Sequence, residues 1–367
     1  MPVIKTASAV DVRSRTGSVW ENFIRSPGLV IAALLIILLL VALVATTIGA
    51  AGIPFGRLMA ALGFGASDPT VIDRDRLVLW SIRFPKIVIA GMVGALLAAG
   101  GTIMQGLFRN PLAEPGLVGV SAGAALAATT VIVIGDKLLD ASGLKLPFEV
   151  LPIAAFVGAL ITTALLYRIA TRERRTSIAT LLLAGIAIGA LAQAVIGFLI
   201  FVADDRQLRD ITFWSLGSLS GSTWGKVTAI APFLGALLVA MPLIARGLDL
   251  MVLGETEAFY MGLKVEQLKR WCIVLVAAAA GAAVSVSGVI GFVGIVVPHL
   301  LRLVLGPGHR ILLPASACFG AILLLCADTF ARVLVSPAEL PIGIVTAAIG
   351  APFFLVLLLK QRGLVGP

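Results

Sequence analysis

Long apolar stretches alternate with short polar segments along the whole chain. A helix that crosses the hydrocarbon core of a bilayer needs roughly 20 apolar residues. Gly288, Gly291, Gly294 and Pro298 flank or interrupt the eighth stretch, which is short, so we expect a half-helix there. The pattern predicts an all-α fold, a polytopic membrane helical bundle of about ten transmembrane helices. The ten stretches lie at residues 28–50, 84–106, 117–134, 149–170, 178–203, 225–246, 270–287, 291–304, 311–332 and 341–360.

The composition agrees with a membrane protein. Of the 367 residues, 59% are hydrophobic and 13% are charged, whereas a soluble domain carries about 25% charge. The net charge of +9 would suit a nucleic-acid-binding protein. The basic residues, however, lie at the ends of the apolar stretches, where they act as topology signals. No nucleic acid is therefore expected as a partner, and the lipid bilayer is.

The charges also predict the orientation. An even number of spans places both termini on one side, and most of the 28 basic residues fall on that side. Arg172, Arg174 and Arg175 in one short loop mark it as cytoplasmic, because cytoplasmic loops are enriched in Lys and Arg. The first apolar run, residues 27–50, is too long for the apolar region of a signal peptide. Residues 1–27 are predicted to be a cytoplasmic N-terminal tail, and residues 28–362 a transmembrane domain.

Two Gly-rich segments look like an internal repeat. Residues 99–111 and 287–298 are both runs of small residues that close in a proline. An odd number of spans separates them, so the predicted repeat is inverted, an arrangement common in transporters. Chance similarity between two Gly-rich helices remains the alternative.

Residues 251–269 are the one long charged segment in the hydrophobic second half. Such a segment cannot lie in lipid, so we expect it at the membrane surface, where a soluble partner can bind it. Glu255 and Glu257 suit the N-terminus of a helix, and Gly262 suits its end. Lys264, Lys269 and Arg270 are expected to anchor the following span at the interface. An ordinary interfacial loop is the alternative.

Little in the sequence suggests catalysis or a metal site. The three cysteines lie in apolar stretches without metal-ligand spacing, and there are two histidines. We interpret His299 as a packing histidine that hydrogen-bonds a carbonyl freed by Pro298. Asp328 is the only carboxylate deep within a span, and Arg332, four residues on, is expected to pair with it. We predict no enzyme activity, no cofactor and no metal.

Several motifs in one order resemble a known family, the permeases of ATP-binding-cassette (ABC) importers. Gly254, Glu255, Ala258 and Gly262 match the spacing of their coupling loop. Residues 109–123 (RNPLAEPGLVGVSAG) resemble the signature of the branch that takes up iron-siderophores, haem and vitamin B12. Further matching segments are residues 83–86, 176–177, 181–185, 214–221, 291–299, 309–310 and 338–343.

The resemblance implies a permease domain at residues 28–362 in a bacterial inner membrane. It implies a homodimer, two copies of a cytoplasmic ABC ATPase that bind the coupling segment, and a periplasmic substrate-binding protein. This fits the chain itself, which has no G-x-x-x-x-G-K-[ST] phosphate loop.

The resemblance also assigns roles to single residues. Arg83, Lys86 and Arg332 correspond to positions that dock the binding protein; without it, they would be interpreted as interface anchors. Thr176 and Ser177 correspond to the cytoplasmic gate, and Ser177 also suits a helix N-cap.

Residues 105–116 most resemble haem permeases. Haem is therefore the expected substrate, and a ferric siderophore and vitamin B12 stay open. An ion-coupled secondary transporter is the alternative of another class, with Asp328 as its only candidate coupling site.

Overall fold

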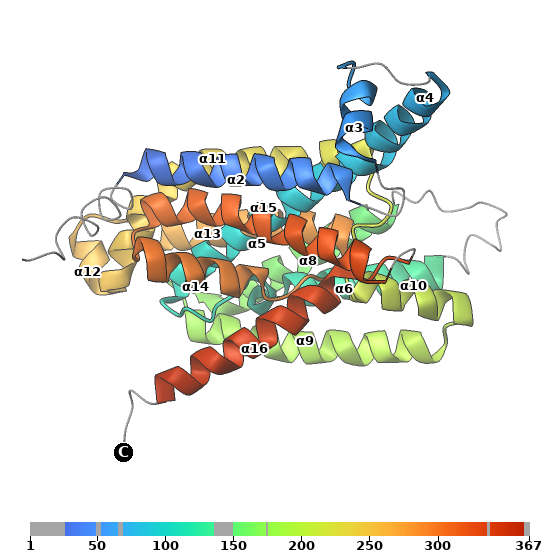
Figure 1. Ribbon diagram of the computed structural model, residues 1–367. Coiled ribbons are helices and arrows are strands. Elements are labelled where there is room, and N and C mark those ends of the chain that lie inside the picture. The colour runs from blue at the N-terminus through green and yellow to red at the C-terminus, as the bar shows by residue number, and fades with distance from the viewer. Residues whose placement is uncertain are drawn as a thin grey trace, which may run out of the picture.

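The computed structural model describes residues 26–48, 53–64, 69–135, 150–173, 175–335 and 338–362. These residues form a bundle of long helices that run roughly side by side (Figure 1). Nearly all of the predicted cytoplasmic tail, residues 1–27, lies outside the described residues.

Ten apolar helices of the described chain each overlap one of the ten predicted spans, which confirms the all-α membrane bundle. Seven of them are long and apolar enough to cross a membrane, and one of the seven, α5, is extended at its start by η2 and most of α4. The apolar stretches of α6, α14 and α16 are shorter. The thirteen residues of α14 confirm the predicted half-helix. The ten are α2 (Pro27–Thr47), α5 (Phe84–Phe108), α6 (Val120–Thr130, continued by η4, Val131–Gly135), α8 (Val150–Ala170), α9 (Ile178–Phe201), α11 (Trp224–Leu253), α13 (Val265–Ser287), α14 (Val293–Leu305), α15 (His309–Leu334) and α16 (Ile342–Arg362).

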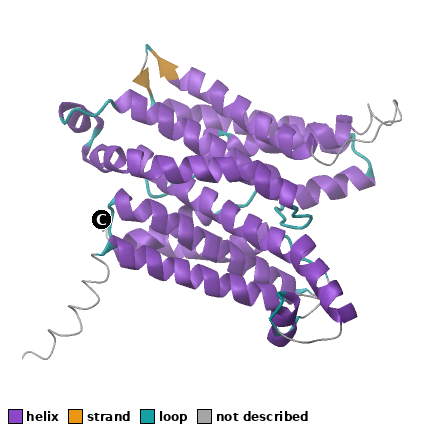
Figure 2. Ribbon diagram, turned by 90° about the horizontal axis from the view of Figure 1, so that it is seen from above, coloured by secondary structure: helices purple, strands orange, loops and turns teal. Residues whose placement is uncertain are grey.

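The short elements gather at the two ends of the bundle. One end, which we call the α12 end, carries α12 (Glu255–Tyr260) and a hairpin of β1 (Thr171–Arg172) and β2 (Arg175–Thr176). Figure 2 shows this hairpin projecting beyond the helices. The opposite end, the α10 end, carries α3 (Phe55–Ala61), α4 (Pro69–Val78) and α10 (Asp205–Ser215) (Figure 1). Two further turns, η2 (Leu79–Arg83) and η3 (Pro115–Val118), precede α5 and α6.

Helix α5 is the centre of the bundle. It is buried over nearly its whole length and packs on α15, α13, α14 and α11. A Cβ atom on Gly94 would overlap the backbone of Gly320, and one on Gly101 would overlap the backbone of Gly294. Glycines at these contacts let the helix axes approach closely, as in other membrane bundles. The two predicted repeat segments therefore pack against each other here, and their inverted relation stays a prediction.

Large apolar side chains cover the outward faces of the bundle. Leu39 on α2, Leu183 on α9 and Leu243 on α11 are 69%, 69% and 77% exposed. Exposed apolar surface of this extent is unstable in water and stable in lipid. The chain is therefore a multi-pass membrane protein, and functional polar groups are to be sought at its two ends and between its helices.

Candidate functional site

The segment that was predicted to couple the chain to a partner is shorter than expected. Helix α11 continues to Leu253 and α13 begins at Val265. The six-residue helix α12 lies between them, so the non-spanning segment is 254–264 rather than 251–269. At the first edge, the apolar residues Met251 to Leu253 continue α11; at the second, Glu266 and Lys269 lie in the first turns of α13.

The small residues around α12 are explained by the backbone conformation at its two ends and by close packing in its middle. Gly254 ends α11 at a φ of 131°, and Gly262 follows α12 at a φ of 86°, angles that favour glycine. Ala258 is fully buried between them. Glu255 and Glu257 occupy the first turn of α12, as predicted, where the helix dipole favours negative charge.

The tip of α12 exposes three large side chains. Phe259, Tyr260 and Met261 are 66%, 83% and 59% exposed, and the two aromatic rings contact each other edge to face. Aromatic residues and methionine are enriched at protein interfaces. Reasoning from the sequence missed this patch, although a run of three large residues before Gly262 was a visible signal.

Lys269 joins three elements at the α12 end. Its side chain is 2% exposed, and its ammonium nitrogen Nζ lies 2.6 Å from Glu255 Oε2 on α12. Nζ also lies 3.1 Å from Glu266 Oε1 on α13 and donates to the backbone oxygen of Thr176 on β2 at 3.1 Å. The prediction that Lys269 anchors α13 at the membrane interface is therefore wrong, because the side chain turns inward.

The two predicted gate residues differ in their surroundings. Thr176 is buried; its N–H donates to Glu266 Oε2 at 3.0 Å, and its hydroxyl lies 3.1 Å from that of Thr171. Ser177 is exposed and accepts a hydrogen bond from the N–H of Thr180 at 3.2 Å, so its predicted role as N-cap of α9 is confirmed. The gate role of both residues stays a prediction.

A second charged cluster lies towards the α10 end. Asp328 Oδ2 lies 3.0 Å from Arg332 Nε, which confirms the predicted pair on α15. Lys86 Nζ, on α5, lies 3.6 Å from Asp328 Oδ1 and 2.8 Å from Glu339 Oε1. The side chains of Lys86, Asp328 and Arg332 are all less than 10% exposed, and that of Glu339 is 42% exposed. The pair is thus part of a four-residue cluster.

The three predicted docking residues are all bound within their own chain. Arg83 is buried and donates to the backbone oxygen of Thr46, and Arg332 donates to that of Ile48 at 3.1 Å. Lys86 is held by the cluster just described. This burial does not favour direct contact of these side chains with another protein in the present conformation. Their docking role stays a prediction.

Glu339 is the exposed member of the second cluster. Burial raises the pKa of its carboxyl group, but hydrogen bonds from Lys86 and from Ser220, with the charge of Lys86, lower it by more. The net pKa lies below the ordinary value, so Glu339 is a carboxylate at neutral pH. Sequence analysis missed this residue, because its partner Lys86 is 253 positions away along the chain.

The described residues offer no ready ligand set for a metal. Within the described ranges, no three His, Cys, Asp or Glu residues lie close enough together to hold an ion. The ring of His299 contacts that of Phe353 at a centroid distance of 6.1 Å. Its Nε2 atom is buried without a hydrogen-bond partner among these residues, so the predicted bond to a freed carbonyl does not involve this nitrogen.

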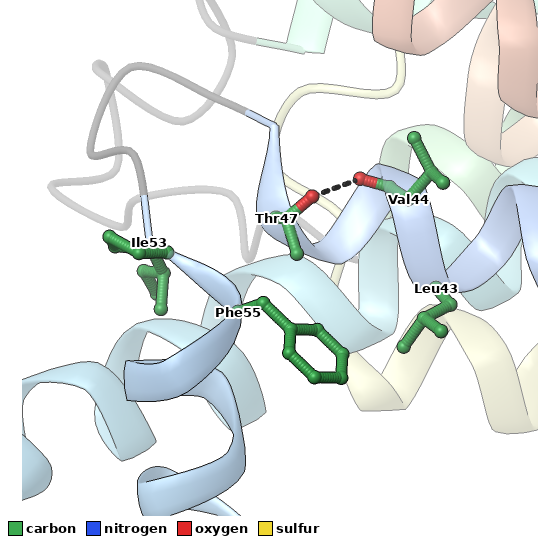
Figure 3. A pocket seen from close by; sticks show the side chains of 6 residues that line it. Leu43, Val44, Thr47, Ile53 and Phe55 are labelled. Atoms are coloured by element: carbon green, nitrogen blue, oxygen red, sulfur yellow. Dashed lines mark hydrogen bonds between the residues drawn. The ribbon is translucent and has the colours of Figure 1, made fainter.

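Several cavities lie within the described part of the bundle or at its surface. One of about 690 Å³ is lined by Glu339, Ser220 and Trp214, and another of about 680 Å³ by Trp214, Glu114 and Gln193. Trp214 thus borders both. Another, of about 560 Å³ between α2 and α3, is lined by five apolar residues and Thr47, whose hydroxyl donates to the oxygen of Val44 at 2.8 Å (Figure 3). Polar side chains, including Glu339 and Ser220 in the first and Glu114 and Gln193 in the second, line the other two cavities.

Comparison with known proteins identifies similar chains. A family model described as the FecCD transport family matches residues 34–360. The hemin transport system permease protein HmuU of Yersinia pestis is 43% identical over 92% of this chain and 97% of its own length. The cobalamin import system permease protein BtuC of Halobacterium salinarum is 42% identical, over 84% of this chain and 80% of its own.

A solved structure has the same architecture. It is described as an inward-facing conformation of a metal-chelate type ABC transporter, and it aligns with a TM-score of 0.78 at 32% identity. The alignment covers 90% of this chain and 98% of that one. The helical bundle and the sequence motifs thus point to the same relatives.

Proposed function

The chain belongs to the FecCD transport family of ABC importer permeases, and on that premise we propose that it is the membrane subunit of an ATP-driven importer for haem. The observation that carries the proposal is the construction of the α12 end. A six-residue helix there exposes Phe259, Tyr260 and Met261, while Glu255 on the same helix is tied inward to Lys269. A surface that binds one partner and is bonded to the bundle can transmit movement.

The source of energy is proposed to be another polypeptide. The sequence contains no P-loop motif that would cradle the phosphates of ATP. Two copies of a cytoplasmic ATPase would each receive one α12 through its exposed tip. ATP binding would draw the ATPases together, displace α12, and reorient the bundle in an alternating-access cycle.

The assembly is proposed to be a homodimer in a bacterial inner membrane, with the α12 end cytoplasmic and the α10 end facing a periplasmic binding protein. The N-terminal end of α2 and the C-terminal end of α16 both lie at the α12 end (Figure 1). This arrangement supports a cytoplasmic position for both chain termini. The predicted docking residues Arg83, Lys86 and Arg332 lie towards the opposite end. Of the four-residue cluster there, Glu339 has the most exposed side chain.

Haem is proposed as the substrate because the hemin permease matches over 97% of its own length. The cobalamin permease is nearly as similar, so vitamin B12 is the second candidate, and a ferric siderophore the third. A lack of clustered ligands in the described part of the chain is compatible with all three, since selectivity can reside in the binding protein. An ion-coupled transporter would need a coupling site, and the carboxylate of Asp328 is already neutralised by Lys86 and Arg332.

The test is to purify the chain with its co-expressed ATPase and binding protein and to reconstitute the complex in liposomes. We expect haem to stimulate ATP hydrolysis and to give a Soret absorbance on the binding protein. Stimulation by cobalamin or a ferric siderophore, but not by haem, would replace the substrate and leave the importer assignment intact. Uptake driven by a proton gradient without ATP would overturn the assignment itself.

A further inference from the structure

We propose that Lys269 is the positioning residue that makes α12 and the β1–β2 hairpin move as one body, so that displacement of the coupling helix reaches Thr176. This inference rests on the proposed function. It adds to that function the physical link between the partner-binding helix and the predicted gate.

The link is a convergence of three elements on one nitrogen. Lys269 is on the first turns of α13, Glu255 is 14 residues before it on α12, and Thr176 is 93 residues before it on β2. Lys269 Nζ contacts both at 2.6 Å and 3.1 Å. Helix α12 and the hairpin are thus joined through a single side chain of the neighbouring helix.

The bonding of the ammonium group is complete. A lysine carries three N–H donors, and Lys269 has three acceptors: Glu255 Oε2, Glu266 Oε1 and the backbone oxygen of Thr176. Because the side chain is 2% exposed, water cannot readily replace a lost acceptor. Loss of any one bond leaves a buried charge under-solvated, so the three bonds form and break together.

Glu266 completes the hold on Thr176. Its Oε2 accepts from the N–H of Thr176 at 3.0 Å, while its Oε1 lies 3.1 Å from Lys269 Nζ. Both backbone polar groups of Thr176 are therefore bonded to α13 side chains. The position of the Thr176 backbone therefore depends on where Lys269 and Glu266 lie, and Ser177, the N-cap of α9, follows directly.

The cluster of Lys269, Glu255 and Glu266 is accessible to the partner on its carboxylate side. The carboxylates of Glu255 and Glu266 are each 38% exposed, and two carboxylates face one ammonium group. The cluster thus keeps one unit of negative charge at the surface of the α12 end. Helix α12 is short, and its charge-assisted bond from Glu255 to Lys269 lies at a solvent-exposed edge, so α12 can shift without unfolding the bundle. Because Lys269 Nζ also binds the Thr176 oxygen, such a shift would displace β2.

The experiment uses the full complex of permease, ATPase and binding protein in liposomes, and measures solute transported per ATP hydrolysed. We expect Lys269→Met to lower this ratio by about tenfold, within the usual range of coupling between two sites. Lys269→Arg, which keeps the charge and the donors, should restore most of the ratio. Arg270→Met is the matched control, because Arg270 is the next residue on α13, is exposed, and lies outside the segment 254–264; it should keep the wild-type ratio.

Glu255→Gln tests the link if Lys269→Met does not assemble. This substitution keeps the side-chain volume but removes the negative charge of Glu255, the partly exposed partner of Lys269. It should therefore also lower the amount of solute transported per ATP hydrolysed. Combined with Lys269→Met it should add little, because both changes break one link. The inference is overturned if Lys269→Met and Glu255→Gln assemble and keep the wild-type ratio, or if Lys269→Arg is as uncoupled as Lys269→Met. A wild-type complex that transports none of the three solutes with ATP would instead overturn the proposed function.

Discussion

Lys86 on α5 and Glu339, in the segment before α16, are joined by a 2.8 Å ion pair at the α10 end of the bundle. They are 253 positions apart in the sequence. Through Lys86 the pair continues to Asp328 and then to Arg332 on α15. The central helix α5 is therefore tied electrostatically to α15 and to the segment that precedes α16.

We expect Lys86→Met to destabilise the protein more than Glu339→Gln does. The methionine leaves the buried carboxylate of Asp328 with Arg332 as its remaining partner, which should cost about 2 kcal/mol. Glu339 is partly solvated, so its neutralisation should cost less than about 1 kcal/mol. Thermal unfolding of the detergent-solubilised chain measures both. A larger loss for Glu339→Gln would show that the buried part of the cluster contributes little.

The contribution of Glu339 should depend on pH in a defined direction. Its pKa in the folded protein lies below the usual value of 4.5. A carboxyl group with a depressed pKa stabilises fully above its unfolded pKa and loses the contribution as pH falls through the folded one. The difference in melting temperature between the wild type and Glu339→Gln should stay constant from pH 7 to about 5 and shrink only at lower pH. A difference that shrinks already between pH 7 and about 6 would contradict the direction of the shift.

Close packing of glycines should make α5 intolerant of added volume. A Cβ on Gly101 would overlap the backbone of Gly294. Gly101→Ala should therefore cost about 1–3 kcal/mol, or prevent correct assembly. Gly197→Ala on α9 is the control, because no atom lies within 4 Å of its added Cβ. Equal stability of the two variants would mean that α5 and α14 separate more easily than their packing suggests.

The tip of α12 should supply most of the affinity for the ATPase. Replacing Tyr260, which is 83% exposed, by Asp should weaken co-purification of the ATPase by at least about 30-fold, as expected for an aromatic hot spot. The melting temperature of the isolated chain should not change. Trp271→Asp tests whether any exposed aromatic residue matters, because Trp271 is 60% exposed on α13. Unchanged ATPase binding by Tyr260→Asp would place the contact elsewhere.

The lengths of the apolar stretches and the positions of glycines in the sequence predicted the fold well. Apolar length located all ten helices, and the interruptions at Gly288, Gly291 and Gly294 located the short helix α14. Glu255 and Glu257 likewise marked the start of α12, and Gly262 marked its end within two residues. These features are local, since each depends on a few neighbouring residues and on the thickness of a bilayer.

Contacts between distant residues were harder to predict. The pairing of Asp328 with Arg332 was predicted because helical spacing brings them together. The inward turn of Lys269 was not, because a lysine at the start of an apolar helix usually extends to the membrane surface. Its acceptor on β2 is 93 residues away. The burial of Arg83 against Thr46 was missed for the same reason.

The central claim is that this chain moves solute only when an ATPase acts on α12. The most direct measurement is haem flux into liposomes that contain the chain alone, compared with liposomes that contain the chain with its ATPase, its binding protein and ATP. The account predicts no flux above leak for the lone chain and ATP-dependent flux for the complex. Sustained flux through the lone chain, without an energy-supplying partner, would contradict it.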